Sequence, residues 1–344
     1  MVSEAPPFWW ERPGLRSGLL APFGWVYGRV ARRIMERRVR RSMPVPVICV
    51  GNFTVGGSGK TPTALALADA AIARGLVPGF LSRGYGGAVR HATRVDPAHD
   101  SAKLVGDEPM LLAARAMTVV GPDRVAGAEL LIREGAEIII MDDGFQSARL
   151  VFDHAMMVVD ARRGIGNGRV FPAGPVRAPV IDQVRLSDSL LVIGRGNGGD
   201  RLIRMAARAA KPVHIARLEP DFAARLRGFN CLAFAAIGDP EKFFITLEEA
   251  GIRVARRYGF PDHHHFTDEE VASLMDEAAL YGLTLVTTSK DAVRLEGGHG
   301  RSRDLAAAVE VLEVKLEFDQ PGVPGAIITS AIEAFRRRAA SPRD

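Results

Sequence analysis

The chain contains only two cysteines, Cys49 and Cys231, among its 344 residues. Both lie in apolar runs, so we expect buried free thiols in a reducing, intracellular protein and no disulfide framework. No apolar run reaches the roughly 18 residues that a membrane-spanning helix needs. The start of the chain does not resemble a signal peptide, because Glu4 stands where a basic segment is typical and no small-residue cleavage site follows a clear apolar stretch.

What the chain does contain is typical of a globular protein. Apolar residues make up 47% and charged residues 25%, so a core of normal size can form and disorder is not indicated. The length favours two domains over one large α/β domain. The formal net charge is +5, and the positive charge is concentrated in one short stretch near the start.

Residues 1–43 combine aromatic and apolar side chains with this run of arginines. The former come first: Phe8, Trp9, Trp10, Leu19, Leu20, Phe23, Trp25, Val26 and Tyr27. The arginines follow: Arg29, Arg32, Arg33, Arg37, Arg38, Arg40 and Arg41. This pattern suits a helix in the lipid headgroup region, where Trp is favoured, so we predict a membrane-associating segment. The alternatives are a surface helix with a solvated arginine face, or binding of nucleic acid.

Short apolar strands alternate with helices along the rest of the chain, beginning with the buried strand at Val45–Phe53. This alternation predicts a P-loop NTPase-like parallel sheet with helices on both faces, plus a second, smaller α/β domain. We expect the P-loop domain at 44–165, a Gly/Pro-rich linker at 166–180 and the second domain at 181–322. The last helix, at 323–344, is expected to pack back on the first domain.

The stretch GNFTVGGSGKTP, from Gly51 to Pro62, resembles a phosphate-binding loop, although Thr54 stands where the usual pattern begins with Gly. A strand precedes it and a helix starts at its lysine, so backbone N–H groups and the helix dipole favour phosphate there. The predicted nucleotide-binding residues are Thr54, Val55, Gly56, Gly57, Ser58, Gly59, Lys60 and Thr61. The alternative is a glycine-rich turn that only closes a strand–helix unit.

A second metal anchor follows the apolar strand that ends in Asp142 and Asp143. Carboxylates at this place suit Mg²⁺, which the Thr61 hydroxyl would also hold. The segment TTSKDAV at 287–293 lacks the spacing of a guanine-selecting motif, since Asp291 directly follows Lys290. We therefore predict ATP as the nucleotide.

Two further segments carry titratable groups. Asp107 and Glu108 stand at a helix start, where N-terminal capping is the simplest explanation. The segment FPDHHHF, at 260–266, holds three consecutive histidines, which diverge too far in a regular element to bind one metal. A single histidine beside a carboxylate is better suited to act as a general base.

Taken in order, these motifs resemble the tetraacyldisaccharide 4'-kinase family, the lipid A 4'-kinases of Gram-negative bacteria. The resemblance runs from the N-terminal segment to about Leu295 and includes VGNFTVGGSGKTP, SRGYGG, VGDEP, DDGFQ, GNGRVFPAGPVR, AIGDPEKFF, FPDHH and TTSKDAVRL. It implies transfer of the γ-phosphate of ATP, with Mg²⁺, to the 4'-hydroxyl of a tetraacylated glucosamine disaccharide 1-phosphate. It also implies a place at the cytoplasmic face of the inner membrane, with no nucleic acid and no obligate protein partner.

The resemblance further implies a base dyad of Asp107 and His263, with Lys60 stabilising the transferring phosphoryl group. By the predicted boundaries the dyad residues lie in different domains, so a cleft would have to close to assemble them. The residues expected to contact substrate are Arg83, Glu108, Gln146 and Arg177, of which Arg177 suits bidentate phosphate binding.

The chain departs from the family's common pattern at Ser147, Ala178 and Ser289, none of them in the P-loop or the dyad. The main alternative is a P-loop switch ATPase of the partition or metallochaperone type. A third hypothesis is a peripheral membrane adaptor with a relict nucleotide site, which would bind ATP without turnover. The aromatic residues beside the arginines and the FPDHH motif favour the kinase.

Overall fold

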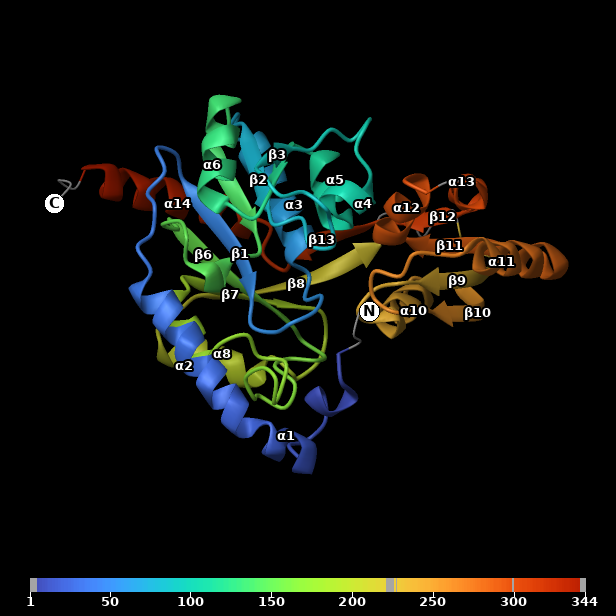
Figure 1. The fold of residues 1–344 in the computed structure, drawn as a ribbon, viewed down its shortest axis with the longest axis horizontal. Coiled ribbons are helices and arrows are strands. Elements are labelled where there is room, and N and C mark those ends of the chain that lie inside the picture. The colour runs from blue at the N-terminus through green and yellow to red at the C-terminus, as the bar shows by residue number, and fades with distance from the viewer. Residues whose placement is uncertain (1–4, 221–225, 227, 299, 341–344) are drawn as a thin grey trace.

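The structure is a computed structural model that describes residues 5–220, 226, 228–298 and 300–340 (Figure 1). Its larger sheet has nine strands, all parallel except the two edge strands, β13 and β3. In spatial order they are β13 (Val314–Phe318), β8 (Val213–Pro220), β7 (Ser189–Ile193), β6 (His154–Asp160), β1 (Val47–Asn52), β5 (Ile138–Asp142), β2 (Pro78–Ser82), β4 (Met117–Val120) and β3 (Thr93–Arg94).

Helices cover both faces of this sheet, as its apolar strands predict. Successive side chains of a strand point to opposite faces, so Val47 and Cys49 enter one core while Ile48 and Val50 enter the other. The first core is completed by α2 (Ala21–Arg37), α6 (Arg124–Arg133), α7 (Val180–Leu186) and α8 (Asp200–Arg208). The second is completed by α3 (Lys60–Ile72), α5 (Asp107–Ala113) and α14 (Val323–Ala340). The predicted parallel sheet with two covered faces is confirmed.

A smaller four-stranded parallel sheet forms a second unit beside the first (Figure 1). Its order is β10 (Arg253–Gly259), β9 (Asn230–Ala235), β11 (Thr284–Thr288) and β12 (Glu310–Leu312). One face packs against α10 (Pro240–Glu249), and the other against α11 (Asp268–Tyr281), α12 (Ser289–Glu296) and α13 (Arg301–Ala308). Helix α12 also packs against α5 of the large unit, so these two helices form the seam between the units.

The predicted boundary between the domains at residue 181 is wrong. Strand β7 pairs with β6, and β8 pairs with β7, so residues up to Pro220 belong to the large sheet. Residues 166–180 therefore join two neighbouring strands of one sheet and do not link domains. The composition misled the prediction because Gly and Pro mark loops within a sheet as well as linkers. The segment VEVLEVKLEF is also divided: β12 joins the small sheet, while β13 returns to the large one.

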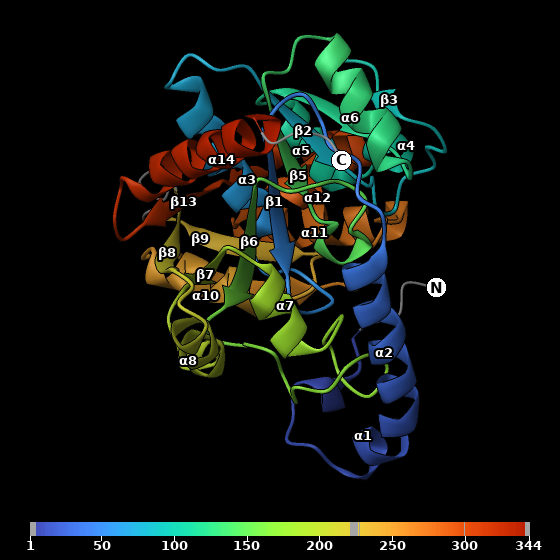
Figure 2. The same ribbon diagram turned by 90° about the vertical axis from the view of Figure 1, so that its left-hand side faces the viewer.

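The N-terminal segment forms a short 3-10 helix (Pro7–Trp9), α1 (Leu15–Leu19) and the long helix α2, which extends away from the sheets (Figure 2). Gly24 and Gly28 are the buried residues in the first half of α2, and a Cβ at Gly24 would lie 2.7 Å from the Val170 carbonyl oxygen. The helix therefore packs through its glycines. Its large apolar residues are left exposed: Phe23, Trp25, Val26, Tyr27 and Val30, with Leu15 and Leu19 preceding them in α1.

Candidate active site

The predicted phosphate loop connects β1 to α3 at the carboxyl end of the central strand. Gly56 and Gly59 adopt φ values of +107° and +92°, which L side chains rarely tolerate, and Lys60 begins the helix. Thr54 has no such positive φ, so a residue with a Cβ fits there and the missing glycine costs nothing. The Ser58 hydroxyl is buried without a hydrogen-bond partner. A buried orphan polar atom in a loop of this shape is what a phosphate ligand would satisfy.

The paired aspartates lie beside this loop because β5 is the parallel neighbour of β1. The Thr61 hydroxyl donates to Asp142 Oδ2 at 3.2 Å. Lys60 Nζ lies 3.8 Å from Asp143 Oδ2. The second oxygen of Asp142, Oδ1, is buried with no partner. These contacts bring together the lysine, the hydroxyl and both carboxylates of the predicted site.

The pKa values of the two aspartates are shifted in opposite directions. Burial and the nearby Glu108 raise the pKa of Asp142 to about 7, although Lys60 acts in the opposite direction. Burial also disfavours the charge on Asp143, but Lys60 and Arg177 outweigh it and hold the pKa of Asp143 well below its usual range. A bound cation would stabilise the charged form of Asp142 as an opposite charge does. Its orphan oxygen and raised pKa therefore fit a metal ligand.

Among the described residues, no group of three or more His, Cys, Asp or Glu side chains could hold a metal ion. This absence does not conflict with Mg²⁺, which is usually bound through one or two carboxylates, waters and the phosphates of the substrate. A hydroxyl and a carboxylate, Thr61 and Asp142, fit that pattern.

The predicted substrate residues are placed differently from one another. Arg177 Nη1 donates to both carboxylate oxygens of Asp143, at 3.0 and 2.9 Å, and its Nε donates to the Thr54 carbonyl oxygen at 2.9 Å, so its guanidinium is already engaged at the aspartate pair. Gln146 Nε2 donates to the Asn52 carbonyl oxygen at 2.8 Å. Arg83 is exposed on the loop after β2. Their contacts with a substrate remain predictions.

Asp107 and His263 meet at the seam between the two units. Asp107 is the first residue of α5, after Gly106 with φ of +94°, and its side chain is 4% exposed. His263 lies in the loop after β10 with φ of +59°, and its Nδ1 is 3.5 Å from Asp107 Oδ2. The expectation that a cleft must close to bring them together is wrong for this pair, because helix packing across the seam already does so.

The environment keeps the carboxylate charged and the imidazole basic. Burial opposes the charge on Asp107, but the His263 hydrogen bond, Lys290 and Arg294 outweigh it and hold the pKa of Asp107 well below its usual range. The hydrogen bond to Asp107 raises the pKa of His263, although burial and Arg294 act in the opposite direction. A carboxylate that accepts from Nδ1 leaves Nε2 free to accept a proton.

Two cations that lie at this seam were assigned no role in the sequence analysis. Lys290 Nζ donates to Glu108 Oε1 at 2.6 Å, and Arg294 Nη2 donates to Asp107 Oδ2. Both come from the TTSKDAVRL segment on α12. Their spacing of four residues places them on one face of a helix, which was a usable signal, but only the packing of α12 on α5 gives that face its partners.

The small unit also reaches the phosphate loop. Asp239, which precedes α10, pairs with Arg162 and with Arg163 Nη2, the latter at 2.9 Å, and Lys242 pairs with Asp160 at the end of β6. A Cβ on Gly238 would lie 3.9 Å from the Gly57 nitrogen. The loop that precedes α10 therefore borders the phosphate loop.

Known proteins share this arrangement of sequence and fold. The chain matches the family described as Tetraacyldisaccharide-1-P 4'-kinase over residues 16–333. It is 57% identical over 338 residues to the tetraacyldisaccharide 4'-kinase of Rhizobium meliloti and 58% identical to that of Sinorhizobium fredii, with 98% of each chain covered. It also resembles the crystal structure of LpxK from Aquifex aeolicus in complex with ATP, with a TM-score of 0.71 and 27% identity over 93% of this chain and 100% of that one.

Proposed function

The chain belongs to the tetraacyldisaccharide-1-P 4'-kinase family, and we propose that Asp107 and His263 form the general base of its phosphoryl transfer. The chain is an ATP-dependent kinase that phosphorylates the 4'-hydroxyl of a tetraacyldisaccharide 1-phosphate, a step of lipid A biosynthesis. The observation that carries the assignment of the base is the contact between the buried Asp107 carboxylate and the His263 imidazole, whose Nδ1 lies 3.5 Å from Asp107 Oδ2.

In the proposed reaction, the 4'-oxygen forms a bond to the γ-phosphorus of ATP, and the bond from that phosphorus to the β,γ-bridging oxygen breaks to release ADP. The hydroxyl proton passes to His263 Nε2, and Asp107 stabilises the imidazolium that results. A sugar hydroxyl is a weak nucleophile, so an oriented base contributes roughly 10²–10⁴-fold.

Lys60 and the N-terminus of α3 hold the β- and γ-phosphates in this proposal. Thr61, Asp142 and Asp143 are the residues that would hold Mg²⁺; the unpartnered Oδ1 of Asp142 and the hydrogen bond from Thr61 to Asp142 support this assignment. When bound, the ion offsets negative charge on the phosphates. Arg177 orients Asp143 by the two contacts of its Nη1.

The test of the dyad is transfer of labelled γ-phosphate from ATP to a tetraacyldisaccharide 1-phosphate in detergent micelles. We expect Asp107→Ala and His263→Ala each to lower kcat by about 10²-fold or more with little change in KM for ATP, because the phosphate loop stays intact. Lys60→Ala is the inactive control, because loss of the phosphate-binding lysine should abolish transfer. Equal, small losses in the two dyad variants would contradict the assignment. ATP hydrolysis without labelled lipid would point to a switch ATPase.

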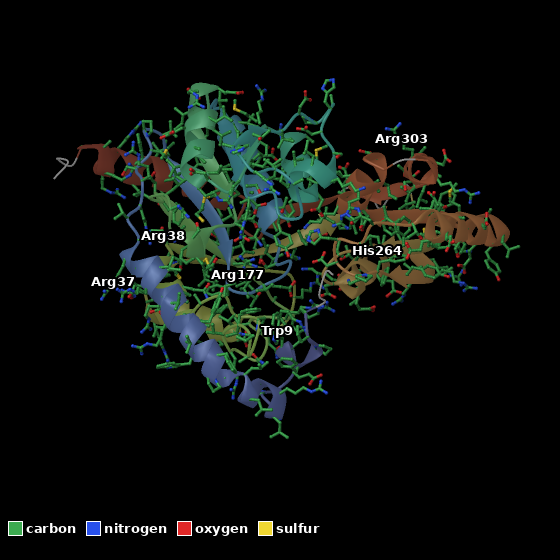
Figure 3. All side chains as sticks on the ribbon, in the orientation of Figure 1. Trp9, Arg37, Arg38, Arg177, His264 and Arg303 are labelled. Carbon is green, nitrogen blue, oxygen red and sulfur yellow. The ribbon has the colours of Figure 1, made fainter. Side chains whose placement is uncertain are left out.

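We also propose that α1 and α2 seat the enzyme on the cytoplasmic face of the inner membrane. The glycines of α2 face the protein, so the exposed apolar side chains of α1 and α2 do not belong to its core. Arginines accompany them: Arg29 lies over the Trp25 ring at 4.8 Å, and Arg37 ends α2 on its exposed side (Figure 3). None of the helices in the described residues is long and apolar enough to span a bilayer. These features suit an interfacial helix.

Trp9 does not share in this surface. It is buried, and its Nε1 donates to the Pro172 carbonyl oxygen at 3.0 Å. Trp10 is half-buried and lies beside Arg163 near the phosphate loop. Of the three tryptophans expected at the membrane interface, Trp25 is the exposed one.

Sedimentation with vesicles that contain anionic lipid tests this proposal. Phe23→Ser with Trp25→Ser should weaken binding by at least about 10-fold, since each buried large apolar side chain contributes roughly 1.5–3 kcal/mol. The matched control is Leu280→Ser with Tyr281→Ser, which removes two exposed apolar side chains from the far end of α11. Equal binding by both double variants would contradict the proposal.

A further inference from the structure

We infer that Arg294 is a positioning residue that aligns Asp107 and His263 across the seam between the two sheets. The inference rests on the proposed function, because it assigns a role to a residue that acts through the proposed dyad. Arg294 lies on α12 of the small unit, and its side chain is 3% exposed. Burying a guanidinium is costly unless every part of it is paired, so its contacts indicate what it is there to hold.

The guanidinium contacts four groups from four segments. Nη1 donates to Asp291 Oδ1 at 2.8 Å and to the Ala236 carbonyl oxygen at 2.7 Å. Nη2 donates to Asp107 Oδ2 and lies 3.3 Å from His263 Nδ1. Asp291 is itself fixed, since its carboxylate accepts from the Ala236 N–H at 3.2 Å and from the Thr288 hydroxyl at 2.6 Å. Nη1 of Arg294 therefore contacts a carboxylate that is itself held in place, Asp291, while Nη2 contacts the dyad.

Arg294 and His263 are also linked through the backbone. The His263 N–H donates to the Ala236 carbonyl oxygen at 3.2 Å, which is the oxygen that accepts from Arg294 Nη1. This contact fixes the main chain of a residue that holds a left-handed φ of +59°, a conformation that costs energy for any residue with a Cβ. The same guanidinium thus braces the backbone of the base and the carboxylate that orients its ring.

The geometry around Asp107 Oδ2 favours one tautomer of His263. If the Nδ1–H of His263 points at this oxygen, two donors 3.3 Å apart converge on one acceptor, which a carboxylate oxygen can accommodate. The proton is then on Nδ1, and Nε2 carries the lone pair. A rotated Asp107 carboxylate would leave Arg294 as the donor to Nδ1, and the proton would move to Nε2. Fixing Asp107 therefore keeps the lone pair on the outward nitrogen.

Charge is the second contribution. Arg294 opposes protonation of His263, while Asp107 promotes it. Four titratable or charged groups face His263: Asp107 from α5, Arg294 from α12, the adjacent Asp262 and Tyr85. Asp262 Oδ1 is 3.8 Å from His263 Nε2, and the Tyr85 ring centroid is 5.5 Å from that of His263. Lys290 of α12 acts on His263 indirectly, through Asp107. Removing the positive charge of Arg294 should make His263 easier to protonate, so the base should be lost at a higher pH.

Two variants separate geometry from charge. Arg294→Lys keeps a positive charge but loses the planar fork that contacts Asp107 and Ala236 together. The double variant Arg294→Gln/Asp291→Asn removes both charges, so that no buried carboxylate of α12 is left without its partner. The readouts are kcat and KM for ATP from the labelled-phosphate assay, the pH profile of kcat, and the thermal unfolding midpoint of each full-length variant.

We expect both variants to keep KM for ATP within about 3-fold and to lose at least about 10-fold in kcat, a part of the roughly 10²–10⁴-fold that an oriented base supplies. The acid limb of the kcat profile should move to higher pH in the double variant and stay in place in Arg294→Lys. Retention of kcat in both variants would overturn the inference. A loss of kcat together with a higher KM for ATP and an unchanged acid limb would also overturn the inference, because it would indicate a role in folding alone.

The dyad variants distinguish this failure from failure of the proposed function. If His263→Ala keeps its kcat, the dyad itself is refuted. If His263→Ala loses activity while both Arg294 variants keep theirs, only the role of Arg294 is refuted.

Discussion

The three glycines of the phosphate loop should respond differently to the same substitution with alanine. At Gly57 the φ is not positive and nothing lies within 4 Å of an added Cβ. At Gly56 the space is also open, but φ is +107°. At Gly59, φ is +92° and the Cβ would lie 2.6 Å from Ile193 Cδ1 of β7. The series therefore separates a neutral site, a site with backbone strain, and a site with strain plus a clash.

The expected losses in unfolding free energy follow from these differences. Gly57→Ala should change it by less than about 0.5 kcal/mol. Gly56→Ala should lose about 1–2 kcal/mol, the cost of a left-handed residue with a Cβ. Gly59→Ala should lose that amount plus about 1–3 kcal/mol for the overpacked contact.

A double-mutant cycle isolates the clash. Ile193→Val removes Cδ1 and alone should cost about 0.5–1.5 kcal/mol. The remaining Ile193 atoms lie at 3.8 Å or more from the added Cβ, so Gly59→Ala should cost less in that background. We expect the double variant to be more stable than the sum of the single effects by about 1–3 kcal/mol, measured by urea unfolding without nucleotide. Additivity within about 0.5 kcal/mol would refute the steric reasoning.

The remaining predictions also concern stability. Burial and Glu108 raise the folded-state pKa of Asp142 to about 7. The stability that Asp142 contributes in its protonated form is therefore lost as the pH rises from the ordinary carboxyl range through 7. Asp142→Asn should stabilise the metal-free protein at pH 8 by a few kcal/mol at most. Asp143 has a depressed pKa, so Asp143→Asn should instead destabilise the protein at pH 8, and this loss of stability should shrink in acid. Urea unfolding of the two variants in EDTA at pH 5 and 8 tests both predictions. Effects of the same sign in the two variants would contradict this reasoning. Arg338 donates from Nε and Nη2 to Asp153, both at 2.9 Å, and Asp153 Oδ2 also accepts from the Val47 N–H at 2.9 Å. Arg338→Met should cost about 3–5 kcal/mol, because it leaves the buried Asp153 carboxylate without its cation. The matched control is Arg337→Met on the solvent side of α14, and equal unfolding curves for the two variants would argue against the pairing.

The parts of the site that the sequence predicts are those set by neighbours along the chain. A strand, a glycine-rich turn and a helix that starts at Lys60 follow from local pattern, and the Asp pair follows from the end of an apolar strand. Contacts between distant segments were not predictable in this way. The packing of α12 on α5 decides that Arg294 meets Asp107, and nothing in either segment specifies the other. The domain boundary failed for a related reason, since strand pairing decides which sheet receives β7 and β8.

The way the small unit is attached limits how the site can come apart. The chain leaves the large sheet at Pro220 of β8 and returns at Val314 of β13, and these two residues are register partners in one antiparallel pair. The two connections between the large sheet and the small unit thus start from neighbouring residues at one point near the sheet edge, which can act as a hinge. His263, Asp291 and Arg294 all lie between those connections, while Asp107 and Lys60 belong to the large unit. Any rotation about this point would therefore move His263, Asp291 and Arg294 together relative to Asp107 and Lys60.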